Sequence, residues 1–308
     1  MPLKHKDFLG LRGVPGEEID EILNTSELMK HILLQNHKKT PHLQGKSIVT
    51  LFYENSTRTR LSFELAGKYM SASASNVTAS SSSVSKGETL IDTGKTIEMM
   101  GTDVLIIRHP LSGAPHHLAK HLKSSVINAG DGTNEHPTQA LLDMFTIKSK
   151  KGRLQGVKVA IVGDILHSRV ARSNIWGLNT MGAEIRVAAP PTLIPIGLDS
   201  MGVKVCRYID QALEGADVVM ALRLQKERQQ RGLIPSLREY ATLYGINKKR
   251  LALADKEAIV MHPGPMNRGV EINTDVADAE ISEINEQVTN GVAVRMALLY
   301  LITRRRGQ

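Results

Sequence analysis

The sequence predicts an α/β protein with two doubly wound parallel-sheet domains. Short runs of β-branched and aliphatic residues recur along the chain, and segments whose apolar residues follow helical spacing separate them. Strands that alternate with helices in this way form parallel sheets covered by helices on both faces. The chain has 308 residues, which favours two domains because one domain usually holds ~100–200 residues.

The first series of elements opens with a helix expected over residues 17–35, where apolar residues recur at rough helical spacing. Residues 47–53 are β-branched and aromatic, which is typical of a buried strand. A helix begins near Ser56, directly after this strand. Further strands are expected at residues 103–107 and 125–129, and the second of these leads to another helix start.

The second series follows a boundary at residues 148–156, which are basic and contain little apolar content. It begins with a strand at residues 157–164 and ends in an amphipathic helix over about residues 282–303. Between them we expect strands at 183–189, 203–208, 217–222 and 258–261, and helices at 170–181 and 236–244. The predicted domains are residues 1–148 and 149–284, followed by a C-terminal helix in residues 285–308.

The formal charge of +8 admits two interpretations. One is nucleic-acid binding, and the other is a site that attracts small anionic substrates. RNA binding is the remote alternative, because aromatic residues are not interleaved on a basic face. Residues 304–306, the densest basic cluster, are typical of a solvated tail. Cys206 is the only cysteine, so no intrachain disulfide can form. No apolar stretch is long enough for a membrane span, and we expect a cytoplasmic protein.

Polar side chains gather at one predicted edge of each sheet. In open α/β sheets, ligands bind beyond the carboxyl ends of the strands, and these residues come directly after strands. They are Ser56, Thr57, Arg58, Thr59, Arg108, His136 and Gln139 in the first series, and residues 167–169, Arg223, Gln225 and residues 262–265 in the second.

The chemistry of these residues indicates anionic ligands. A helix start with hydroxyl groups and unpaired N–H groups forms a phosphate site, and Arg58 adds a planar fork for phosphate oxygens. Thr59, Arg108 and His136 could donate hydrogen bonds to a carbonyl oxygen as it gains charge. Taken singly, each feature has a structural explanation, such as a capped helix with a solvated arginine. Their joint position at one edge favours a site.

Several cofactor classes are disfavoured. Neither a dinucleotide-binding glycine pattern nor a nucleotide-triphosphate loop occurs in the sequence. His116, His117 and His121 lie close together, but we interpret them as a solvated helix face, since no zinc motif surrounds them. We therefore expect no metal and no cofactor.

Two segments resemble signatures of the aspartate/ornithine carbamoyltransferase family. Residues 52–60, FYENSTRTR, are similar to its carbamoyl phosphate loop, and residues 136–143, HPTQALLD, are similar to its second signature. The resemblance runs over nearly the whole chain. It implies a carbamoyl phosphate-binding domain at residues 1–148, an aspartate-binding domain at 149–284, an active site between them, and a C-terminal helix that packs back on the first domain.

The resemblance also implies a role for each residue. The phosphate would be held by Ser56, Thr57, Arg58, Thr59 and Arg108. The carbamoyl carbonyl would be polarised by Thr59, Arg108 and His136, and the carbamoyl amide would be held by Gln139 and by backbone carbonyls of Gly264 and Pro265.

The serine-rich segment, residues 71–85, reads as a flexible linker from composition alone. Residues 82–88, however, resemble the mobile loop that reaches into a neighbouring subunit's site in this family. The loop would supply Lys86 and a serine, which is Ser82 or, alternatively, Ser83. The resemblance therefore implies a homotrimer with shared sites, and it leaves open whether regulatory or dihydroorotase-like chains bind the trimer.

The second substrate implied by the resemblance is L-aspartate. Arg223 and Gln225 resemble the aspartate-binding loop, and Arg169 and Lys86 would add further contacts. Two arginines suit a dicarboxylate and repel an ammonium group, which favours L-aspartate. The alternative acceptor is another amino acid, such as ornithine. The implied activity is transfer of the carbamoyl group of carbamoyl phosphate to L-aspartate in pyrimidine biosynthesis. One departure is Met266 after Pro265, where some relatives carry arginine.

Overall fold

The computed structural model describes residues 3–78, 87–225 and 232–304. Ser82, Ser83 and Lys86 lie outside the described residues. The chain divides into two compact units, one of residues 1–145 with 288–308 and one of residues 146–287. Each unit holds one parallel sheet, which confirms the predicted fold class. No helix of the described part combines the length and apolar character that a membrane span requires.

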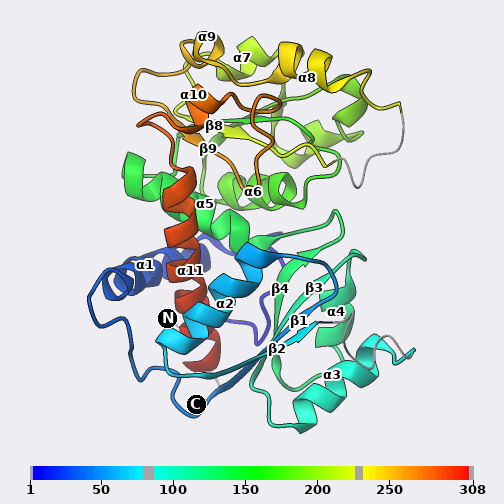
Figure 1. The fold of residues 1–308 in the computed structure, drawn as a ribbon, viewed down its shortest axis with the longest axis vertical. Helices are drawn as coiled ribbons and strands as arrows, with labels where there is room; N and C mark the ends of the chain where they lie inside the picture. The colour runs from blue at the N-terminus through cyan, green and yellow to red at the C-terminus, as the bar shows by residue number, and fades with distance from the viewer. Residues whose placement is uncertain (1–2, 79–86, 226–231, 305–308) are drawn as a thin grey trace. The chain divides into compact units, whose positions relative to one another are not determined.

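The first unit contains a four-stranded sheet in the order β2-β1-β3-β4 (Figure 1). Its strands are β1 (Ser47–Phe52), β2 (Ser73–Thr78), β3 (Val104–His109) and β4 (Ser125–Asp131). Every pairing is parallel, and Phe52 lies opposite Arg108. This register places Arg108 beside the end of β1, from which the predicted phosphate loop departs.

Helices cover this sheet, and aliphatic residues fill the space between. The helices are α1 (Gly16–Leu33), α2 (Thr57–Tyr69), α3 (Leu90–Met99), α4 (Ala114–Ala119), most of α5 (Pro137–Lys151) and most of α11 (Ile284–Arg304). Leu51, Leu105 and Ile107 of the strands pack with Ile97 of α3 and Leu118 of α4 in one buried cluster.

The C-terminal helix packs on the first unit, as predicted. The guanidinium of Arg295 in α11 lies 5.0 Å from the ring of Phe63 in α2. Its Nη2 donates to Thr138 Oγ1 in α5 at 3.4 Å. A side chain at Gly291 would come within 3.1 Å of Leu142 in α5, so a glycine at this position permits the close approach of the two helices.

The second unit contains a five-stranded parallel sheet in the order β7-β6-β5-β8-β9. Its strands are β5 (Lys158–Val162), β6 (Glu184–Ala188), β7 (Lys204–Val205), β8 (Val218–Ala221) and β9 (Ile259–Met261). Its helices are α6 (Arg169–Thr180), α7 (Ile209–Leu213), α8 (Leu237–Tyr244), α9 (Lys248–Leu251) and α10 (Thr274–Ala277), with two short 3₁₀ turns at Pro191–Leu193 and Leu198–Met201.

Two expectations from the sequence were wrong. Ser73–Thr78 is not a linker but the edge strand β2, in register with β1 from Ser47 to Phe52. Its serines, Ser73 and Ser75, are both exposed, so the strand lacks the apolar signal of a buried one. The strand expected at residues 203–208 shrinks to Lys204–Val205, since Tyr208 caps helix α7.

Candidate active site

The predicted phosphate loop forms the start of α2. Ser56 occupies the position before the helix, with φ −157° and ψ 96°, and its side chain makes no capping hydrogen bond. The first turn contains no acidic residue. The positive end of the helix dipole is therefore not neutralised from within the helix, which suits a phosphate ligand. Thr57 and Arg58 are exposed at this end, whereas Thr59 is buried.

Arg108 is held at the carboxyl end of β3. Its Nε donates to Glu54 Oε2 at 3.2 Å, and its Nη1 donates to the carbonyl oxygen of Ala129 at 3.4 Å. Since Glu54 follows β1 and Ala129 lies in β4, three neighbouring strands contribute to its position. Two contacts from different directions fix the plane of the guanidinium, and only 14% of this side chain is exposed.

His136 precedes the first residue of α5 and approaches Thr59. The Thr59 Oγ1 atom lies 3.5 Å from His136 Nε2. His136 is 5% exposed and Thr59 is 7% exposed. The carbonyl oxygen of His136 accepts from the backbone N–H of Gln139 at 3.0 Å, which fixes the first turn. The structure thus brings together the starts of α2 and α5.

A buried carboxylate network holds the loop before His136. Asp131 accepts from the backbone N–H groups of Gly113 at 2.7 Å and Glu135 at 3.1 Å. The carboxylate of Glu135 accepts from the backbone N–H of Leu11 at 2.8 Å. Sequence reasoning missed these supporting residues, because an acidic residue in a loop carries no signal of burial.

Asp164 organises the corresponding edge of the second unit. It follows β5, is fully buried, and accepts from His167 Nδ1 at 2.8 Å and from the Gln225 backbone N–H at 3.2 Å. The loops after β5 and β8 are therefore joined. Arg169 is buried in the first turn of α6, and Arg223 is half-buried after β8. Sequence reasoning also missed Asp164.

The segment after β9 is fixed by side chains of the same unit. The backbone N–H of His262 donates to Gln287 Oε1 at 3.0 Å, and the backbone N–H of Gly264 donates to His262 Nδ1 at 2.8 Å. Because Nδ1 accepts, a neutral His262 carries its proton on Nε2, which lies 3.3 Å from Glu271 Oε1. Gly264 and Pro265 are joined by a cis peptide bond.

Met266, Arg268 and the neighbouring histidines His117 and His121 each have a structural explanation. Met266 packs against the apolar cluster of the second unit. Arg268 forms a two-pronged ion pair with Asp278, at 2.9 and 2.7 Å. His117 and His121 are exposed and stack edge-to-face at 4.9 Å. Among the described residues, no three His, Cys, Asp or Glu side chains gather as a metal site would require.

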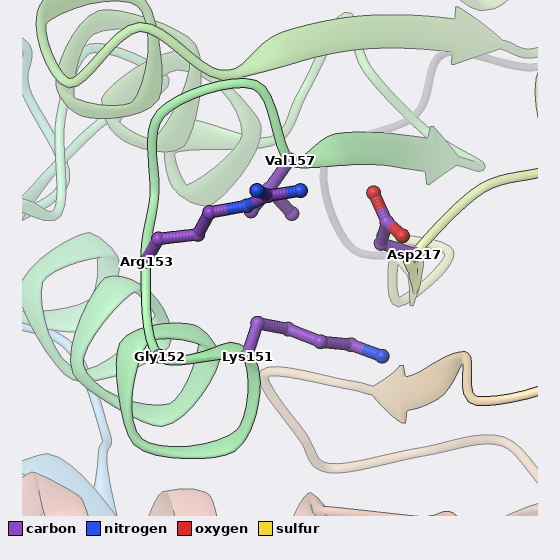
Figure 2. Close-up of a pocket in the computed structure, with 5 residues that line it drawn as sticks. All are labelled: Lys151, Gly152, Arg153, Val157 and Asp217. Carbon is purple, nitrogen blue, oxygen red and sulfur yellow. The ribbon is translucent and has the colours of Figure 1, made fainter.

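One surface pocket of the second unit lies away from the predicted residues. Lys151, Arg153, Val157 and Asp217 line it together with Gly152 (Figure 2). Asp217 Oδ2 accepts from the backbone N–H of Lys158 at 2.8 Å, so the pocket borders the amino ends of β5 and β8. None of the predicted ligand-binding residues lines it, and its position is the edge opposite to theirs.

The chain is similar to known proteins over almost its whole length. Residues 6–149 match the model of the aspartate/ornithine carbamoyltransferase carbamoyl-P binding domain, and residues 155–302 match that of the Asp/Orn binding domain. The chain is 69% identical to the aspartate carbamoyltransferase catalytic subunit of Ruminiclostridium cellulolyticum, over 99% of this chain and 97% of the relative. It is 68% identical to that of Acetivibrio thermocellus, over 99% and 98%.

Solved structures resemble the fold over almost its full length. Aspartate transcarbamoylase from Trypanosoma cruzi in complex with carbamoyl phosphate and aspartate has a TM-score of 0.88 and 31% identity, covering 97% of both chains. Ornithine carbamoyltransferase from Pyrococcus furiosus has a TM-score of 0.87 and 29% identity, covering 98% of both chains.

Proposed function

The chain belongs to the aspartate/ornithine carbamoyltransferase family, and we propose that the residues at the carboxyl ends of its two sheets perform the reaction of that family. The chain is an aspartate carbamoyltransferase: it transfers the carbamoyl group of carbamoyl phosphate to L-aspartate and yields carbamoyl aspartate and phosphate. This confirms the activity predicted from the sequence. The assignment of individual residues remains our proposal.

The proposed phosphate site is the start of α2 with Arg108. The Ser56 hydroxyl is not used as a cap, and the first turn carries no opposing acid. Backbone N–H groups at Thr57, Arg58 and Thr59 can therefore bind phosphate oxygens with the Ser56 hydroxyl. Arg108 adds a guanidinium whose plane Glu54 and Ala129 fix.

The proposed oxyanion site consists of Thr59, Arg108 and His136. When the aspartate amine attacks the carbamoyl carbon, the carbonyl oxygen gains negative charge. Donors that are already in place stabilise this charge without reorganisation. The new C–N bond forms as the C–O bond to phosphate breaks, and the leaving phosphate can take the amine proton. Arg58 and Lys86 would neutralise the phosphate, so no protein base is needed.

The remaining proposed contacts concern the carbamoyl amide and L-aspartate. Gln139 and the carbonyl oxygens of Gly264 and Pro265 would hold the carbamoyl amide. Arg169, Arg223, Gln225 and Lys86 would bind L-aspartate. Two arginines match its two carboxylates, and Asp164 ties the Gln225 loop to the start of α6.

We further propose that the enzyme is a cytoplasmic homotrimer whose sites are shared between neighbours. Ser82 (or Ser83) and Lys86 would enter the site of the adjacent subunit. Mixing Lys86→Ala chains with Arg58→Ala chains tests this arrangement, because a mixed trimer then contains some sites with both residues intact. Absence of recovered activity in verified mixed trimers would refute the shared site.

The observation that carries the residue assignment is the approach of Thr59 to His136 beside the unopposed start of α2. The test is formation of carbamoyl aspartate by the purified chain, with L-ornithine as a parallel acceptor. We expect turnover with L-aspartate alone. Arg58→Ala should nearly abolish it with the fold intact, whereas near-normal turnover in that variant would overturn the site.

A further inference from the structure

Gln139 belongs to a buried group of polar side chains on α5, the helix that begins after His136. Gln139 Nε2 donates to Asp143 Oδ1 at 2.9 Å, one helical turn further along α5. Asp143 is fully buried and Gln139 is 9% exposed. Gln139 has a role in the proposed reaction, whereas Asp143 and its charged neighbour Arg295 in α11 have none.

Arg295 of α11 supplies the positive charge of this buried polar group. Its side chain is 3% exposed, and its guanidinium lies over Phe63 at 5.0 Å. Burial lowers the pKa of Arg295 to about 10, and the negative charge of Asp143 opposes that shift. Arg295 therefore stays charged at neutral pH. Since electrostatic coupling is reciprocal, the guanidinium also favours the carboxylate form of Asp143.

The hydrogen bond to Asp143 fixes the orientation of the Gln139 side-chain amide. A carboxylate only accepts hydrogen bonds, whereas a glutamine amide donates through Nε2 and accepts through Oε1. The NH₂ group of Gln139 must therefore face Asp143, and Oε1 must face away from it. Among the described residues, no donor is recorded at Oε1.

We propose that Asp143, supported by Arg295, is a positioning residue that makes the site select an amino group over a methyl group on the acyl phosphate. This inference rests on the proposed contact between Gln139 and the carbamoyl amide. The carbamoyl NH₂ donates to Oε1 of Gln139. An acetyl group has nearly the same shape but no donor, and it would leave Oε1 without a partner in the bound complex.

Asp143→Asn tests the inference with almost no change in shape. An asparagine can turn either its NH₂ group or its oxygen toward Gln139, so the glutamine amide loses its single orientation. We expect kcat/KM for carbamoyl phosphate to fall about 10-fold, the effect of one hydrogen bond. The inhibition constant of acetyl phosphate, assayed as a competitor of carbamoyl phosphate, should stay unchanged. The inference is overturned if the binding of both ligands weakens equally, or if the binding of neither ligand changes.

Gln139→Leu separates this inference from the proposed function. We expect this variant to weaken the binding of carbamoyl phosphate and to leave the binding of acetyl phosphate unchanged. The selectivity is the affinity for carbamoyl phosphate relative to that for acetyl phosphate. If Gln139→Leu leaves this selectivity unchanged, Gln139 does not contact the carbamoyl group, and both proposals fail. If Gln139→Leu lowers the selectivity for carbamoyl phosphate over acetyl phosphate while Asp143→Asn does not, the site assignment stands and the orienting role of Asp143 is wrong.

A second pair of variants guards against loss of folding. Asp143→Asn leaves Arg295 as a buried, unpaired charge, which is strongly destabilising. The double variant Asp143→Asn with Arg295→Met removes both charges and should show the same loss of ligand selectivity. Thr303→Ala is the matched control, because it removes a buried hydrogen bond from the same helix at Leu299. It should lower stability and leave the selectivity ratio unchanged.

Discussion

The Oγ1 atom of Thr59 lies 3.5 Å from Nε2 of His136, although 77 positions separate the two residues along the chain. Each residue belongs to the first turn of a helix or directly precedes it, and the two helices follow strands of the same parallel sheet. The contact is therefore a product of sheet topology, which brings successive helix starts to one edge.

Thr59→Val should lower kcat without unfolding the protein. The substitution keeps the shape of the side chain and removes one donor from the proposed oxyanion site. Loss of one such donor costs ~10²–10³ in turnover. Turnover under saturating substrates measures the effect. Thr50→Val, which removes a hydrogen bond to Asn76 within the same sheet, is the control and should retain normal kcat.

Asp164→Asn should raise KM for L-aspartate and leave KM for carbamoyl phosphate unchanged. An amide has one accepting oxygen, so it cannot satisfy both His167 and the Gln225 backbone as the carboxylate does. We expect an increase of about 10-fold, equivalent to ~1.4 kcal/mol. Steady-state kinetics with each substrate varied in turn decides the matter, and a parallel rise in both KM values would contradict the local role.

Gly10→Ala should destabilise the protein through Glu135. A methyl group at this position would clash with Glu135 Oε1, and overpacking of a buried site typically costs ~1–3 kcal/mol. Urea unfolding measures the loss. In a Glu135→Ala background the same change should cost little, because the group it meets is gone. Additive losses in this double-mutant cycle would show that Gly10 acts through something else.

Stability should decline on mild acidification because of His109. Burial lowers the pKa of His109 below its ordinary value of 6.5, against the opposing charges of Glu54 and Asp131. As the pH drops below 6.5, the unfolded chain binds the proton more readily than the folded one. Folding stability therefore decreases as the pH is lowered.

His109→Asn should reduce this decline, since asparagine can still accept from the Leu111 N–H that now donates to Nδ1 at 3.0 Å. Urea midpoints at about pH 5.5 and about pH 7.5 compare the two proteins across the titration range of histidine. An identical difference between the two pH values in both proteins would exclude His109 as the cause.

The sequence located the proposed ligand-binding residues but not the buried residues that hold them in place. Residues such as Arg58 and His136 follow strongly apolar strands, so the position of the strand locates them. Ser73–Thr78 was missed as a strand because its stability comes from pairing with β1, not from buried side chains. Asp143 and Arg295 are 152 positions apart in the sequence, and only the tertiary packing of α5 and α11 makes them partners.

The return of α11 to the first unit has a consequence for synthesis of the protein. The first unit consists of residues 1–145 and 288–308, so its last helix is translated only after the whole second unit. Until then, Phe63 and Thr138 lack their contacts with Arg295. The nascent chain therefore cannot complete its first unit until the second unit has been translated.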